Sequence, residues 1–321
     1  MTLILTFLTS AIRLGITFLL GSTGEIITEK SGHLNLGIPG IMCIGAACGC
    51  LGESLYTRSL ENYDMMNPFL AVIIPLLCAM LGAALMGLIY SFLTVTLRAN
   101  QNVTGLALTT FGVGVTNYII SQLDFVSFQR GSRFFTASLP FAQDLGWFGQ
   151  LFFSYGFMVY MGIAIAVVAS IVLTKTRLGL HLRSVGENPA TADAMGINVT
   201  AYRYGATCVG SAIAGLGGLF FVMDYLGGNW EYCIDAMGWL SIALVIFTVW
   251  KPHMSILGSF LFGGLYIAYN YISGVTFAQK ELLKMLPYVV TIVVLIITSI
   301  RNKPENQPPA GLGSNYYRED R

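Results

Sequence analysis

Residues 183–200 read RSVGENPATADAMGINVT, a polar stretch between two strongly apolar segments of the chain. Asn188 is a favoured N-cap residue, and Pro189 suits the first helical position because its missing N–H needs no partner there. Gly196 can adopt the left-handed conformation that ends a helix. The stretch therefore predicts a short helix between Asn188 and Gly196. So short a helix is not stable alone in water, and either its own chain or a partner must hold it.

The composition of the chain predicts a membrane protein. Of its 321 residues, 55% are hydrophobic and only 10% are charged, whereas soluble domains have about 25% charged residues. There is too little polar surface to cover a water-soluble fold of this length. The net charge of +1 gives no general attraction for nucleic acid.

Long apolar stretches predict the membrane-spanning helices, each of which needs roughly 20 apolar residues. The candidate spans are residues 2–20, 34–56, 68–97, 102–122, 151–174, 201–226, 237–250, 253–274 and 284–300. The predicted fold is therefore all-α, a polytopic bundle of about nine spans. The membrane domain covers residues 1–301, with the polar stretch at about 175–200 inside it. Residues 302–321 are polar and rich in Pro and Gly, which predicts a disordered tail.

Basic residues set the predicted orientation, because Lys and Arg gather in cytoplasmic loops. Lys175, Arg177 and Arg183 lie in one loop, and further basic residues lie in the tail after residue 300. The even number of predicted spans between them puts both on one side, which is then the cytoplasmic side. The capped helix is thus expected in the cytoplasm, with Met1 and the long loop 123–150 outside.

Small and polar residues inside the spans indicate how the helices associate. Gly210, Ala214 and Gly218 recur at helical spacing, which lets helix backbones approach closely in lipid. Polar residues are costly there, so some of them are expected to line a polar path. The candidates for the path are Asn35, Gln101, Thr104 and Asn117. Hydrogen bonding between helices is the alternative, as is snorkelling for Arg13 and Asp224, which lie near span ends.

The sequence predicts no metal site, cofactor or catalytic centre. Cys43, Cys48 and Cys50 form the only cysteine cluster, and no His or carboxylate stands at a ligand spacing from them. The chain's three histidines fall in loops or at span ends, so an intramembrane enzyme with a nucleophile beside its base is disfavoured.

Four segments resemble the permease subunits of bacterial ATP-binding-cassette (ABC) importers, in the family that handles ribose-like sugars, nucleosides and branched-chain amino acids. The segments are RLGLHLRSVGENPATADAMGINV (177–199), GEIITEKSGHLNLGIPGIMCIGA (24–46), RANQNVTGLALTTFGVG (98–114) and AMGWLSIALVIFTVWKP (236–252), the last followed by FGG at 262–264. They follow the family's order and span most of the chain. The GENP and NLG motifs look most like those of nucleoside and simple-sugar permeases.

The resemblance implies a transport subunit in the bacterial inner membrane that forms half of the path for a small polar solute. It implies three protein partners: a cassette ATPase, a second permease chain that is similar but different, so that the pair is a heterodimer, and an extracytoplasmic solute-binding protein that docks on outer loops such as 123–150. The chain has no phosphate-loop motif of its own, so the ATPase would drive transport.

The resemblance also makes the capped helix the coupling helix that the ATPase grips. The residues expected at this contact are Glu187, Asn188, Pro189, Ala192, Asp193 and Gly196. Thr191 and Asp193 are expected to face outward, and Ala192 is expected against the ATPase, where a large side chain would not fit. An ion-coupled secondary transporter acting alone is the rival reading, although carboxylates are scarce at the centres of the predicted spans.

Overall fold

The computed structural model describes residues 2–60, 65–138, 140–142, 144–272, 274, 276–301 and 306–317, and within these ranges every regular element is helical. The predicted all-α fold is confirmed. The longer helices are α1 (Thr2–Glu29), α2 (Ile38–Arg58), α3 (Pro68–Ser91), α4 (Gln101–Ser121), α5 (Phe125–Phe135), α7 (Phe157–Lys175), α8 (Arg177–Glu187), α10 (Val199–Phe220), α11 (Ile234–Phe247), α12 (Pro252–Ile267) and α14 (Leu286–Arg301). The shorter elements are α6 (Gly146–Phe152), α9 (Pro189–Ala194), α13 (Phe277–Lys284), the π-helical segments η2 (Phe92–Thr96) and η4 (Phe221–Tyr225), and the 3₁₀-helices η3 (Pro140–Ala142) and η5 (Ala268–Asn270).

Seven helices of the described chain are long and apolar enough to cross a membrane. They are Leu3–Glu29, Ile38–Arg58, Pro68–Thr96, Gln101–Ser121, Phe157–Lys175, Val199–Tyr225 and Phe277–Arg301. The other two predicted spans correspond to α11, of 14 residues, and α12, of 16 residues. At a rise of about 1.5 Å per residue, both are shorter than a hydrocarbon core of about 30 Å.

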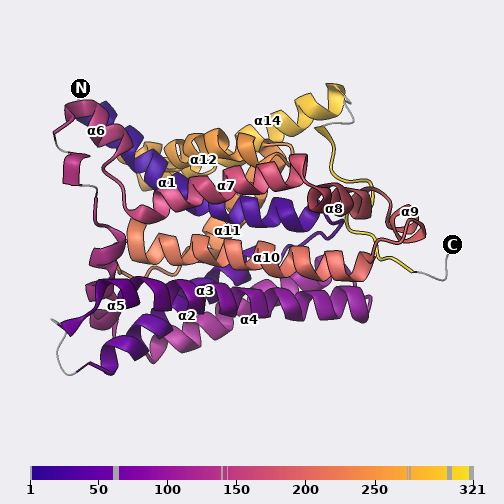
Figure 1. Cartoon of the computed structure of the whole chain (residues 1–321). Helices are drawn as coiled ribbons and strands as arrows, with labels where there is room; N and C mark the ends of the chain where they lie inside the picture. Colours follow the sequence, from indigo (N-terminus) through magenta and orange to yellow (C-terminus); the bar gives the residue numbers. More distant parts are fainter. Residues whose placement is uncertain are drawn as a thin grey trace.

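The two ends of the bundle carry different structures (Figure 1). α8, α9 and the described part of the tail gather at one end, whereas α5, α6 and the start of α1 lie at the other. The loop 123–150, predicted as a long outer loop, contains α5, η3 and α6. Its position opposite α9 agrees with the predicted topology. We call the end with α9 the coupling end and the other the outer end.

Glycines bring α1, α2 and α10 together at the centre of the bundle. A Cβ atom on Gly45 of α2 would lie 2.4 Å from the Cα of Gly215 in α10, and one on Gly24 of α1 would lie 2.2 Å from the carbonyl oxygen of Gly210. At Gly218 a Cβ would lie 2.0 Å from the carbonyl oxygen of Met42. The predicted stripe on α10 therefore packs against two different helices, as expected for association by close van der Waals contact.

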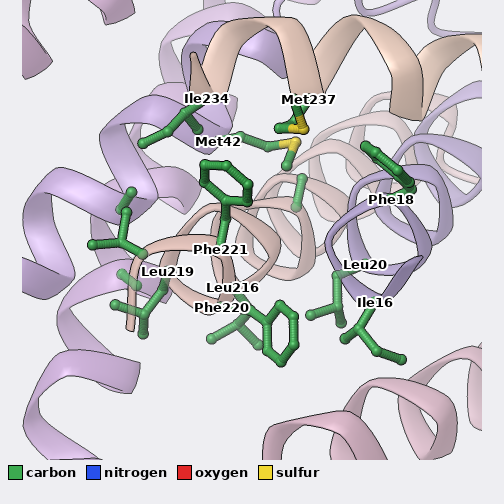
Figure 2. Close-up of a cluster of buried hydrophobic side chains, with 14 of the residues drawn as sticks. Ile16, Phe18, Leu20, Met42, Leu216, Leu219, Phe220, Phe221, Ile234 and Met237 are labelled. Carbon is green, nitrogen blue, oxygen red and sulfur yellow. The ribbon is translucent and has the colours of Figure 1, made fainter. Parts of the chain in front are cut away.

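Large apolar side chains fill the space beside these glycine contacts. Phe221 points toward Met42 and Met237, while Leu216, Leu219 and Phe220 extend from α10 on its other sides (Figure 2). All of these residues belong to one buried cluster that also includes Phe18 and Leu20 of α1. Because α1, α2, α10 and α11 share this cluster, the packing of any one of them depends on the others.

An ion pair joins α1 to η4, the element that follows α10, near the outer end. Arg13 Nε donates to Asp224 Oδ1 at 2.7 Å, and Arg13 Nη2 donates to the carbonyl oxygen of Asp224. The Asp224 side chain is fully buried. This pairing replaces the snorkelling that the sequence allowed for these residues, because each charge compensates the other inside the bundle.

The Gly45–Gly215 contact gives a test of this packing. We expect Gly45→Ala to lower the thermal unfolding temperature of the detergent-solubilised protein by several degrees, because overpacking a closely packed site costs about 1–3 kcal/mol. Gly114→Ala on α4 is the matched control, since a Cβ there meets no atom within 4 Å. An equal unfolding temperature in both variants would contradict the assigned α2–α10 contact.

Candidate functional site

The capped helix forms as the sequence predicts. α9 spans Pro189–Ala194; the Asn188 side chain accepts a hydrogen bond from the N–H of Thr191 at 3.0 Å. Gly196 has φ +83°, and the N–H of Ile197 donates to the carbonyl oxygen of Ala192 at 3.0 Å. The N-cap and the left-handed glycine thus fix both ends of a helix that is too short to persist alone.

The solvent-facing side of α9 has a hollow of about 200 Å³. Ala192 is only 2% exposed and lies in the hollow, together with the exposed residues Glu187, Asn188 and Thr191. Met195, which was not among the residues expected at this contact, also lines it and is 79% exposed. Ala192 forms part of the hollow and packs in a small cluster with Val185 and Val199, and its contact with an ATPase stays a prediction. A partner would meet the rim around it.

The helix preceding α9 was not predicted. α8 (Arg177–Glu187) begins at Thr176, whose hydroxyl accepts from the N–H of Gly179 at 3.2 Å. Leu182 and Val185 of α8 are buried, while Leu178 and Leu180 are exposed. α8 connects the end of α7 to the coupling site, so the polar stretch is two successive helices rather than a helix in a loop.

Three glycines fasten α8 and α9 to the rest of the bundle, and we call Gly32, Gly186 and Gly311 the glycine junction. A Cβ on Gly186 would lie 2.3 Å from the carbonyl oxygen of Lys30. Gly32 has φ +83°, and its Cβ would lie 3.3 Å from the Cα of Gly186. The N–H of Gly311 donates to the carbonyl oxygen of Gly186 at 2.9 Å. Only residues without side chains allow these three backbones to meet.

The described part of the tail, residues 306–317, lies across the coupling end. The N–H of Ala310 donates to Glu187 Oε2 at 3.1 Å, and Tyr316 Oη donates to Asp193 Oδ2 at 2.7 Å. The N–H of Gly313 donates to the carbonyl oxygen of Gly32 at 3.2 Å. Two predicted coupling residues, Glu187 and Asp193, thus hold the tail. Residues 302–305 and 318–321 of the segment predicted as disordered lie outside the described residues.

Two of the predicted path residues hold the loop between α1 and α2. Asn35 Oδ1 accepts from the N–H of Gly37 at 2.9 Å, and the Asn35 N–H donates to Glu25 Oε1 at 3.1 Å. Gln101 Oε1 accepts from the N–H of Leu34 at 2.8 Å, and Gln101 Nε2 donates to the carbonyl oxygen of Ser314 at 3.3 Å. These contacts make both residues part of the coupling end.

The other two predicted path residues both lie on α4, but one is buried and the other is exposed. Thr104 is buried near the start of the helix, and Asn117 is exposed near its far end. The structure therefore does not bring Asn35, Gln101, Thr104 and Asn117 into one cluster. Thr109, between them, donates from its hydroxyl to the carbonyl oxygen of Leu36 at 2.8 Å.

Buried charges surround the loop that follows α1. Burial lowers the pKa of Lys30, and the nearby carboxylates of Glu187 and Glu29 oppose this shift, while Arg183 reinforces it. Burial also lowers the pKa of His33 to about 3, with a further contribution from the charge of Arg203. His33 is therefore neutral at physiological pH, and its Nδ1 hydrogen-bonds with the hydroxyl of Thr207 at 3.1 Å.

The fold and the coupling end together define a polytopic membrane protein that presents a short, capped and firmly attached helix at one end. The chain belongs to the family described as "Branched-chain amino acid transport system / permease component", whose profile matches residues 7–295. The resemblance found in the sequence is confirmed. The chain is a permease component of an ABC transporter, a membrane-embedded and non-catalytic subunit. Such permeases work with an ATPase and a solute-binding protein.

Curated relatives match along most of their length. The chain is 33% identical over 285 residues to the nucleoside ABC transporter permease protein NupC of Lactococcus lactis, covering 86% of each chain. It is 31% identical over 288 residues to the guanosine ABC transporter permease protein NupQ of Bacillus subtilis, again covering 86% of each. A putative glucose ABC transporter permease protein of Haloferax volcanii, TsgC13, is 29% identical over 335 residues and 97% of each chain. No solved structure matches this chain.

The N-cap of α9 can be tested by hydrogen exchange. We expect Asn188→Ala to speed the exchange of the amides in residues 190–195 about fivefold, because loss of an N-cap costs about 1 kcal/mol. Asn67→Ala is the matched control, since Asn67 caps α3 in the same way, accepting from the N–H of Phe69 at 3.0 Å. Unchanged exchange in α9 of the Asn188 variant would show that the cap does not hold the helix.

Proposed function

We propose that this chain forms half of the path of an ABC importer that carries a nucleoside or a simple sugar into a bacterial cell. A cassette ATPase would grip α9 from the cytoplasm. The relatives support this substrate class, because one is a nucleoside permease, a second a guanosine permease and a third a putative glucose permease. Residues 1–301 would be the permease domain, and residues 302–321 a cytoplasmic tail attached to it.

The observation that carries the coupling role is the attachment of α9 at two places, the glycine junction before it and the Tyr316–Asp193 bond near its end. The N-cap and Gly196 hold its geometry, and the glycine junction connects its N-terminal side to α1 and the tail. Shifting a two-state path from 1:99 to 99:1 needs about 5.5 kcal/mol of differential binding. In a loose loop, this binding energy would only move the loop itself. A short helix that is fixed at two places can transmit the movement to the bundle.

The proposed contact surface is the rim of the hollow over Ala192. Glu187, Asn188, Thr191 and Met195 stand around it with side chains accessible to a partner. Pro189 and Gly196 set where the helix starts and stops. Asp193 lies half-buried and bonds to Tyr316, so its role would be to link α9 to the tail.

The remaining partners would meet other faces of the molecule. The solute-binding protein would dock at the outer end, where α5 and α6 lie (Figure 1). A second, different permease chain would complete the path, and Asn35, Gln101, Thr104 and Asn117 are its proposed polar residues on this chain. In the rival case of a secondary transporter, this chain would move solute without an ATPase.

Substitution of the rim separates these possibilities. In cells that express the complete importer, we expect Met195→Asp to reduce ATP-dependent uptake of labelled guanosine at least tenfold, because it buries an unpaired charge in the ATPase contact. Met195 is exposed in this chain, so the variant should fold and reach the membrane normally. Ala192→Trp should have the same effect by filling the hollow.

Ala190→Trp is the matched control, because Ala190 is exposed on α9 and does not line the hollow. It should leave most of the uptake intact. Unlabelled nucleosides should compete with the uptake of labelled guanosine. Competition by glucose but not by nucleosides would indicate that the substrate is a sugar. Wild-type uptake by Met195→Asp, or uptake by this chain reconstituted alone, would contradict the proposed function.

A further inference from the structure

A second cavity, of about 480 Å³, lies at the coupling end and is distinct from the hollow over Ala192. It lies between η2, the end of α9, the start of α10 and the tail, and the two cavities share only Ile197 among their lining residues. Its polar lining comes from Thr94, Arg98, Asp193, Asn198, Thr200, Arg203 and Tyr316. No role proposed above for coupling or for the path uses Arg98, Thr200 or Arg203.

Arg203 is the most deeply buried of the charged residues that line this cavity, with only 2% of the residue exposed. Its Nε and Nη2 atoms are buried without a hydrogen-bond partner in the described chain, and Nη2 lies beside Gly32. The ion pairs found among the described residues, Arg13–Asp224 and Lys284–Glu281, do not include it. Its close neighbour His33 is neutral at physiological pH. A buried guanidinium with unpaired N–H groups is costly unless an anion compensates it.

The start of α10 adds a second, independent attraction for an anion. α10 has 22 residues and begins at Asn198, whose side chain accepts only from the N–H of Ala201, at 3.0 Å. The first N–H groups of a helix have no acceptor within the helix, and the helix dipole favours negative charge there. Val199 and Thr200 carry such groups, and both line the cavity. Helix starts of this kind bind phosphate groups.

Arg98, which follows η2, supplies a second guanidinium to the lining. It holds the left-handed backbone conformation, with φ 57°, which is strained for a residue with a side chain and clusters at functional sites. Asn315 Nδ2 donates to the Arg98 carbonyl oxygen at 2.7 Å, and the guanidinium lies 4.7 Å from the centre of the Tyr317 ring. The tail thereby holds Arg98 beside the cavity.

The charge of the lining is positive overall. Asp193 is the one carboxylate among the lining residues, and it accepts a hydrogen bond from Tyr316 Oη at 2.7 Å. Two guanidiniums and a helix start therefore outweigh a single carboxylate. The volume is within the range of about 300–1,000 Å³ for small-molecule sites, so the ligand would carry an organic body beside its charged group.

We propose that this cavity binds the phosphate group of a small organic phosphate, held by Arg203, Arg98 and the first turn of α10. The ligand would join the end of α9 to α10 and to the turn before α4, because Asp193 and Gly196 of the α9 segment also line the cavity. Its occupancy would thus change how firmly α9 is attached. The phosphate could belong to a soluble ester in the cytoplasm or to the headgroup of a phospholipid.

The test measures binding to the purified full chain, without ATPase or uptake, so its outcome is independent of the proposed function. In dodecyl maltoside, a detergent without phosphate, ribose 5-phosphate should raise the unfolding temperature and reach saturation, whereas ribose and potassium chloride of equal ionic strength should not. Nanodiscs that contain phosphatidylglycerol form a parallel arm. Stabilisation by that lipid, with no further effect of ribose 5-phosphate, would assign the phosphate group to a headgroup.

In either arm, Arg203→Gln should weaken the stabilising interaction at least tenfold, and Arg203→Lys should retain part of it. If Arg203→Gln does not fold, Arg98→Gln carries the test, with an expected loss of severalfold. Arg177→Gln is the matched control, since Arg177 is exposed and does not line the cavity. Absence of saturable stabilisation in both arms, or equal stabilisation in the Arg98 and Arg203 variants and wild type, would overturn the proposal.

Discussion

The coupling end depends on the contact of three backbones at the glycine junction. Gly186 lies against the carbonyl oxygen of Lys30, Gly32 turns beside it in a left-handed conformation, and Gly311 donates to Gly186 from the tail. A helix of six residues such as α9 has no stability of its own to transmit force. α9 can transmit force because it is attached to the bundle, and the three glycines at that attachment leave no room for a side chain.

Local signals in the sequence were sufficient for the parts of the structure that depend on neighbouring residues. Asn188, Pro189 and Gly196 predicted the start and end of α9, because caps act through groups three or four residues away. Apolar length predicted the long spans in the same way. The prediction missed α8, whose apolar side chains are divided between a buried and an exposed face. A six-residue helix also has too few turns to reveal that Ala192 packs against Val185 and Val199.

Contacts between distant segments could not be predicted from one sequence. Arg13 pairs with Asp224, and Tyr316 with Asp193, across separations that no local pattern encodes. The composition of the tail, which predicts disorder, gives no sign that residues 310–316 bond to α8, α9 and the loop after α1. Arg203 lies within a predicted span, but only its burial beside the start of α10 marks it as a candidate for anion binding.

The most direct test of the account is the ratio of ATP hydrolysed to solute transported when a side chain is introduced at the glycine junction. Gly186→Ala would place a methyl group against the carbonyl oxygen of Lys30 while leaving the hollow over Ala192 accessible to the ATPase. The account predicts that the reconstituted importer carrying this variant assembles and hydrolyses ATP, but that its ratio of ATP hydrolysed to solute transported rises at least tenfold. Hydrogen exchange would first show that the backbone contact at the glycine junction is lost in this variant. If the ratio of ATP hydrolysed to solute transported were then the same as in wild type, the claim that α9 acts through these three glycines would be contradicted.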